Sequence, residues 1–303
     1  EDKQSSTDTI FKYTYHENNR VASLKMSSGE YESWVGNDGF TNTEERLKVI
    51  NDIYDVFPDS YDFIFLILDE PSIPENLNYY GKLIGVSNSI SGLGFQVYDN
   101  SLDYGSNGKL KAVMQLTGLE YLKYGPALHE LAHNWANYAL PTHSVDSQGE
   151  ELSSYLYTGH WGFTGGSTPG QLGGFQQSSL IENGNNSYTV DSFGPFANGG
   201  NGVPYNELEL YLMGMLDIQD LNNFDMFTDI TALSINEKTF DFTAHQKTTF
   251  TSETLIESLG QRIPTYAESQ KEFNLLAIVV TGNSLSDDDW LKAVSYTHLT
   301  LPP

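Results

Sequence analysis

The chain contains no cysteine among its 303 residues. Without thiols it can form neither a disulfide nor a thiolate metal site, so a bound metal ion would have to use His, Asp or Glu. Basic residues are also scarce, because 15 Lys and Arg stand against 40 Asp and Glu, a formal net charge of −25. Nucleic acid and anionic membranes would repel so acidic a chain, and we therefore expect no nucleic-acid partner.

Long apolar runs are missing as well. The longest, FIFLIL at Phe63 to Leu68, is far too short to cross a bilayer, so we expect no membrane span. The chain begins at Glu1 without the pattern of a signal peptide, and its polar first residues are typical of a mature or trimmed N-terminus. Apolar residues at 39% and aromatic residues at 13% are nevertheless enough to build a core.

The periodicity of the chain predicts alternating helices and strands. Asn42 or Thr43 can cap a helix that Pro58 ends, and the apolar run at 63–68 reads as a buried central strand. Pro126 suits the first turn of a helix that continues to about Leu140. Further elements are a β-rich stretch at 81–116, a helical face that runs from Leu208 to Met215, a helix at 252–259, a strand at 273–281 and an acidic helix from 286.

We divide the chain into four segments. Residues 1–40 form a polar segment with strand character, 41–158 a subdomain that carries the helix after Pro126, and 159–294 a C-terminal subdomain that is loop-rich and partly helical. Gly, Asn and Ser dominate 159–204, but recurring aromatic residues favour an ordered region over a linker. The last segment, 295–303, resembles a translated sequencing adapter, and we exclude it as non-native.

The stretch GPALHELAHNW at 125–135 carries the main functional signal. His129 and His133 are four residues apart, so on a helix they lie one turn apart on the same face and can bind one zinc ion. Glu130 follows the first histidine, where a carboxylate can serve as general base. The alternative is an amphipathic helix with surface histidines. We favour the metal site, because the apolar residues around the histidines would leave their imidazoles in need of partners.

A catalytic zinc needs a third protein ligand, and four residues compete for that role. His143 follows the helix closely, Glu150 and Glu151 come next on a predicted helix, and His160 lies in TGHWGF. Glu150 is also explained as part of a capping box that begins at Ser147. The spacing of these residues alone leaves the choice among them open.

The order of elements before the HELAH helix resembles the N-terminal half of zincin metallopeptidases, in which a mixed sheet supports the active-site helix. The combination HELAHNWANY, GHWGF, QLGGF and NELELYLMG over about residues 80–281 also resembles a group of secreted bacterial HExxH proteins. That resemblance implies an α+β zincin-like fold and His160 as third ligand. The Gly and His that follow HExxH in metzincins are replaced here by Ala136 and Ala139.

We therefore expect a secreted or cell-surface bacterial zinc endopeptidase in which Glu130 activates a water beside a zinc ion bound by His129, His133 and His160. Its substrate would be a protein or glycoprotein, and the chain would act as a monomer. Acidic stretches near 99–108 and 286–290 make calcium a second candidate cofactor, although they lack EF-hand spacing. The alternatives are a non-catalytic, metal-stabilised surface binding protein and a mucin-directed glutamate-zincin of the enhancin-like kind that uses Glu151.

Overall fold

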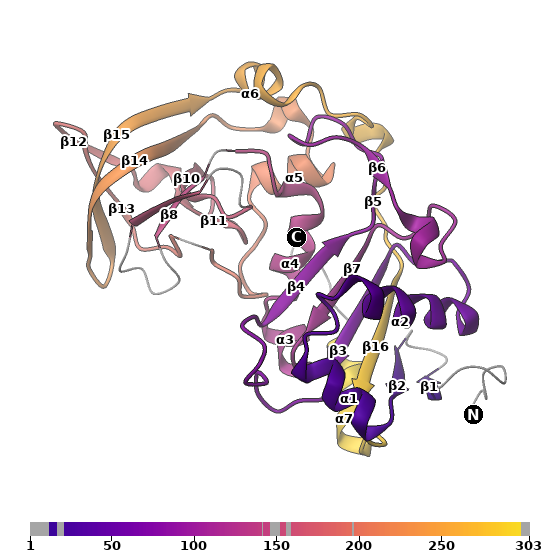
Figure 1. Ribbon diagram of the computed structural model, residues 1–303. Coiled ribbons are helices and arrows are strands. Elements are labelled where there is room, and N and C mark those ends of the chain that lie inside the picture. The colour runs from indigo at the N-terminus through magenta and orange to yellow at the C-terminus, as the bar shows by residue number, and fades with distance from the viewer. Residues whose placement is uncertain are drawn as a thin grey trace. The chain divides into compact units, whose positions relative to one another are not determined.

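A computed structural model describes residues 12–16, 21–140, 142–145, 152–155, 159–195 and 197–297. The chain forms two compact units (Figure 1). The first comprises Glu1–Ser89, Tyr98–Asn134 and Glu272–Leu301, and the second is built mainly from Trp135–Lys271. Both contain helices and sheets, so the expected α+β class is confirmed.

A six-stranded mixed sheet forms the centre of the first unit, in the order β1-β2-β16-β3-β7-β4. Strands β2, β16, β3 and β7 run parallel, whereas β1 and β4 pair antiparallel with their neighbours at the two ends of the order. Every residue of β3 and β7 is buried, as expected of parallel strands covered on both faces. The strands are β1 Lys12–His16, β2 Val21–Lys25, β3 Phe63–Leu68, β4 Gly81–Gly85, β7 Ala112–Leu116 and β16 Leu275–Thr281.

Helices pack on this sheet along its apolar rows. Ile64 and Leu66 of β3 share one core cluster with Trp34 of α1 and with Val49 and Ile53 of α2. The alternate residues of β3 face the opposite side, because successive side chains of a strand point to opposite faces. The unit's helices are α1 Ser28–Gly36, α2 Thr43–Val56, α3 Leu119–Tyr124 and α7 Asp287–Tyr296, together with most of α4 Ala127–Ala136; the short elements are β5 Ser87–Asn88, β6 Tyr98–Asp99 and η1 Ser101–Tyr104.

The second unit has a six-stranded sheet of its own, in the order β11-β10-β14-β15-β13-β12. Its core is aromatic, because Phe163, Phe175, Phe227 and Phe242 are buried against one another with ring centroids 4.8–6.0 Å apart in the contacting pairs. The elements are β8 Thr142–Val145, β9 Leu152–Tyr155, β10 Gly162–Gly166, β11 Gly173–Gln176, η2 Gln177–Ser179, β12 Ile181–Gly184, β13 Ser187–Asp191, α5 Glu207–Met213, η3 Ile218–Asp220, β14 Phe224–Ile235, β15 Thr239–Phe250, α6 Ser252–Leu259 and η4 Tyr266–Glu268.

Several predicted elements are confirmed and others are wrong. The side chain of Asn42 accepts hydrogen bonds from the backbone of Glu44 and Glu45 and so caps α2, and α6 has the predicted bounds. The loop-rich description of 159–294 is wrong, because 162–191 and 224–250 supply six strands of one sheet. Part of the excluded tail is also ordered, since α7 continues through Tyr296.

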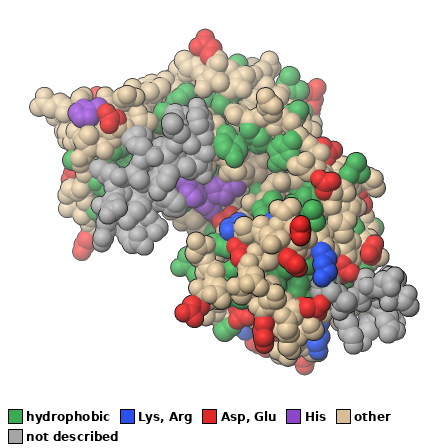
Figure 2. Space-filling view, in the orientation of Figure 1, with side chains coloured by type: hydrophobic (Ala, Val, Ile, Leu, Met, Phe, Trp, Pro, Cys, Tyr) green, Lys and Arg blue, Asp and Glu red, His purple; other side chains and the backbone are tan. Residues whose placement is uncertain are grey.

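The surface reflects the composition. On the face shown in Figure 2, acidic side chains are scattered widely and basic side chains are few. Within the part of the chain that the structure describes, no helix combines the length and the apolar character needed to cross a membrane.

Candidate metal centre

The helix that carries the HELAH motif is α4. It starts directly after Pro126, whose carbonyl accepts the N–H of Glu130 at 2.8 Å, and it ends at Ala136 rather than at the predicted residue 140. Ala132 and Trp135 are buried, so one face of the helix is anchored in apolar surroundings. This packing fixes the rotation of α4 and, with it, the direction in which the two histidines project.

The two histidines of α4 meet at their ring nitrogens. The Nε2 atoms of His129 and His133 lie 3.2 Å apart, and the rings stand at 86° to each other. Two nitrogens bound to one tetrahedral zinc ion at about 2.0–2.1 Å are separated by about 3.3–3.4 Å. His129 is only 6% exposed, so its imidazole is held inside the protein rather than in water. The pair therefore has the spacing that a shared metal ion requires.

The carboxylate of Glu130 lies on the side of α4 that faces strand β4. Burial raises the pKa of Glu130 to about 7, while a hydrogen bond from the backbone of Leu83 and the charge of Lys82 act in the opposite direction. A carboxyl group with a pKa near neutrality can both accept and release a proton at physiological pH, which is the property required of a general base.

Strand β4 contacts Glu130 through a glycine. A Cβ added at Gly81 would lie 2.7 Å from Cγ of Glu130, a distance that real Cβ atoms do not reach. Neither Gly81 nor Leu83 was among the residues expected at the site from the sequence. A glycine at the start of a strand carries no chemical signal, and its partner lies in a helix more than forty positions later.

His160 is placed within the second unit by a chain of backbone hydrogen bonds. The N–H of the next residue, Trp161, donates to the carbonyl of Leu172 at 2.7 Å, and the N–H of Leu172 donates to Oε1 of Glu209 at 2.7 Å. The other oxygen of Glu209 accepts the N–H of Gln171 at 3.1 Å. Glu209 is fully buried, and burial raises its pKa to about 7 although these backbone N–H groups lower it.

The three histidines expected from the sequence lie close together. Each offers one ring nitrogen, and these nitrogens all lie within 4.8 Å of one another. His129 and His133 belong to the first unit and His160 to the second, so the role of His160 as third ligand forms part of the proposal below.

Of the three competing candidates, only the backbone of His143 lies within the described residues. His143 lies in β8, where its backbone is paired with Ser154 of β9. Glu150 and Glu151 lie outside the described residues, but 152–155 form a strand where a helix was predicted. The acidic stretches considered for calcium serve local structure: Asp99 accepts the N–H of Ser101 at 2.9 Å, and residues 287–289 open helix α7.

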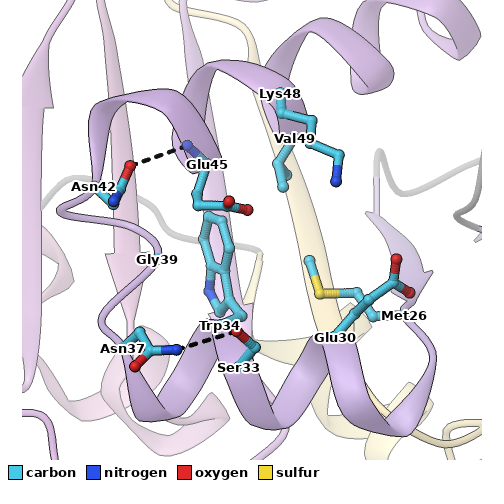
Figure 3. Close-up of a pocket in the computed structure, with 10 residues that line it drawn as sticks. All are labelled: Met26, Glu30, Ser33, Trp34, Asn37, Gly39, Asn42, Glu45, Lys48 and Val49. Carbon is cyan, nitrogen blue, oxygen red and sulfur yellow. Dashed lines mark hydrogen bonds between the residues drawn. The ribbon is translucent and has the colours of Figure 1, made fainter.

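A separate hollow of about 300 Å³ lies in the first unit beside α1 and α2. Figure 3 shows Trp34 at its centre, with Glu30, Glu45 and Lys48 around it. None of the residues of the HELAH motif lines this hollow. Glu30 already caps α1 through Ser27, and no histidine is among the residues that line the hollow.

Comparison of the chain with models of known protein families, with curated proteins and with solved structures gave no match. A functional assignment therefore depends on the geometry of this site.

Proposed function

We propose that the chain is a zinc-dependent endopeptidase in which His129, His133 and His160 bind the metal and Glu130 is the general base. The observation that carries this proposal is the histidine pair of α4, whose Nε2 atoms lie 3.2 Å apart on a helix that also presents Glu130.

The donor set fits zinc better than calcium or magnesium. Imidazole nitrogen suits zinc, whereas calcium and magnesium prefer oxygen ligands, and the chain has no thiolate to offer. His160 supports a three-histidine set because its nitrogen lies within 4.8 Å of those of the α4 pair. Three protein ligands leave one position of a tetrahedral ion for substrate or water, which is the arrangement of catalytic rather than structural zinc.

Zinc, when bound, would supply a Lewis acid that polarises the scissile carbonyl and lowers the pKa of water toward about 7. The chain supplies the proton transfers. The carboxylate of Glu130 takes a proton from the attacking water and later gives it to the leaving amine. In the metal-free chain, burial raises the pKa of this carboxyl group above its usual value.

Strand β4 offers a place for an extended peptide. It is an edge strand of its sheet. The N–H of Val86 donates to the carbonyl of Lys111, and the carbonyl of Tyr80 accepts from the N–H of Thr117, so both groups point to the β7 side. Because hydrogen-bonding groups alternate along an antiparallel strand, the N–H and the carbonyl of Gly81 and the carbonyl of Leu83 point away from the sheet and are not used by Glu130. A substrate could add there as a further strand, with its backbone beside Glu130.

The test is hydrolysis of fluorescently labelled casein by the purified chain. We expect turnover that a zinc chelator abolishes and that one equivalent of zinc restores. Glu130→Gln, which keeps the size of the side chain but not its basicity, should bind zinc and remain inactive. Zinc binding with no hydrolysis by the wild-type chain on casein, gelatin or a mucin would instead support a metal-stabilised binding protein.

A further inference from the structure

We propose that Gly81 and the backbone N–H of Leu83 position the carboxylate of Glu130, so that these two residues of the edge strand β4 orient the base of the reaction. The inference rests on the proposed function, since it names the residues that orient the base of that reaction. All the contacts that support it lie within the first unit.

The first observation is the close approach of β4 to α4. A Cβ at Gly81 would lie 2.7 Å from Cγ of Glu130, 3.0 Å from Cδ2 of Leu116 and 3.2 Å from Cγ of Pro126. The Leu116 methyl is the end of a flexible side chain, whereas the Pro126 ring is rigid. The Glu130 methylene is the closest of the three and would have to move. Only glycine lets the base remain where it is.

The second observation concerns the hydrogen bond to the carboxylate. The backbone N–H of Leu83 is the donor that faces the carboxylate of Glu130. Leu83 lies opposite Met114 in the antiparallel ladder, two residues after Gly81. Its N–H points away from β7 by the alternation described above, so this donor is available to Glu130 without loss of a sheet hydrogen bond.

Together the two contacts hold the base at both ends of its side chain. The missing side chain at Gly81 makes room for the Glu130 methylene, and the Leu83 N–H fixes the direction of the carboxylate. A general base works only within hydrogen-bond reach of the proton that it removes, so a displacement of about 1 Å can reduce the rate by about 10²-fold. Gly81 and Leu83 are thus positioning residues that act through Glu130.

Gly81→Ala tests this directly, with Gly85→Ala as the matched control. Both glycines are in β4 on the same face, and neither has the positive backbone φ that only glycine adopts readily. A Cβ at Gly85 would meet the terminal hydroxyl of Tyr98, which can swing aside. We expect Gly81→Ala to lower kcat by about 10-fold or more, with KM and zinc content unchanged. Gly85→Ala should retain the wild-type kcat.

A second measurement needs neither metal nor substrate. Amide hydrogen exchange, followed by NMR on the zinc-free chain labelled with ¹⁵N-leucine, should show the Leu83 N–H protected in the wild-type chain and in Gly85→Ala. Its exchange should be at least about 10-fold faster in Gly81→Ala and in Glu130→Ala, because an outward-facing N–H on an edge strand has no ladder partner. Equal exchange in all four chains would overturn the proposal.

A third comparison applies if Gly81→Ala does not fold. Leu83→Pro removes the N–H, and proline is tolerated at an outward-facing position of an edge strand, whereas Leu83→Ala removes the same side chain but keeps the N–H. We expect a kcat about 10-fold lower for the Pro variant than for the Ala variant. Equal kcat values would contradict the proposal. If even the wild-type chain fails to hydrolyse protein, the proposed function fails, while the exchange data still decide whether β4 holds Glu130.

Discussion

Replacing Asp38 with Asn removes a charge that anchors the residues at the start of β4. The hydroxyl of Tyr79 donates to Oδ1 of Asp38 at 2.7 Å, and Nζ of Lys82 lies 3.6 Å from Oδ2. The same hydroxyl accepts a hydrogen bond from Nε2 of the buried Gln115 at 2.7 Å, so these hydrogen bonds also connect Asp38 to strand β7. Asp38 has a φ of 48°, which Asn also tolerates, so the variant changes charge without straining the backbone.

The expected loss of stability in Asp38→Asn is modest. Hydrogen bonds to charged groups contribute about 1.5–3 kcal/mol and neutral ones about 1 kcal/mol, and the Asn oxygen can still accept from Tyr79. The ion pair with Lys82 is partly exposed, with side-chain exposures of 33% and 25%, and adds little. We therefore expect Asp38→Asn to lower the free energy of unfolding by about 1 kcal/mol at pH 7.

The difference in stability between wild type and Asp38→Asn should depend on pH in a defined direction. Partial burial raises the pKa of Asp38, but hydrogen bonds from Thr41 and Tyr79 and the charge of Lys82 outweigh it, so the folded-state pKa lies below its usual value. An acid with a depressed folded pKa stabilises the fold fully above its unfolded pKa of about 3.9. That contribution is lost as the pH falls through the lower, folded value.

Urea denaturation at pH 7 and again below pH 3 tests this reasoning. The difference in free energy of unfolding between wild type and Asp38→Asn should be present at pH 7 and should be smaller at the lower pH. Asp55→Asn provides the control, because Asp55 is exposed on α2 and its loss should change stability by no more than about 0.5 kcal/mol. A difference of equal size at both pH values would refute the electrostatic explanation. No difference at pH 7 would refute the claim that Asp38 stabilises the start of β4.

Three further predictions concern the site and the second unit. Glu130→Gln should keep zinc and lower kcat on labelled casein by about 10² or more, and an unchanged kcat would exclude Glu130 as the base. His160→Ala should weaken zinc affinity by at least about 10-fold in competition with a chelating dye, whereas His143→Ala should not; the reverse result would move the third ligand to β8. Phe227→Ala should lower the free energy of unfolding, measured by urea denaturation, by about 3–5 kcal/mol, because the fully buried ring of Phe227 packs against Tyr188 and Phe242. A loss below about 1 kcal/mol would contradict the aromatic core.

Local signals were sufficient to predict helix α2 and strand β3 of the first unit. Asn42 with its following glutamates indicates a helix start, and the uninterrupted apolar run at 63–68 indicates a strand covered on both faces. The histidine spacing predicts a shared helix face in the same way, because it depends only on residues one turn apart. Each of these predictions uses information contained within a few consecutive residues.

The second unit could not be predicted in this way. Strand β10, GFTGG, is rich in glycine and lacks the β-branched residues that usually mark strands, yet it lies between β11 and β14. Its partner residue in β14 is Met226, far along the chain from Thr164. Pairing over such distances is decided by the packing of the aromatic core, which no local pattern encodes. The contact between Gly81 and Glu130 is equally non-local.

The metal content of the purified chain tests the central claim most directly. Wild-type protein and His245→Ala, whose histidine is exposed on β15, should each carry about one equivalent of zinc per chain by inductively coupled plasma mass spectrometry. His129→Ala, which removes one of the two nitrogens that lie 3.2 Å apart, should carry essentially none. Full zinc retention by His129→Ala would contradict the metal centre and, with it, the proposed peptidase.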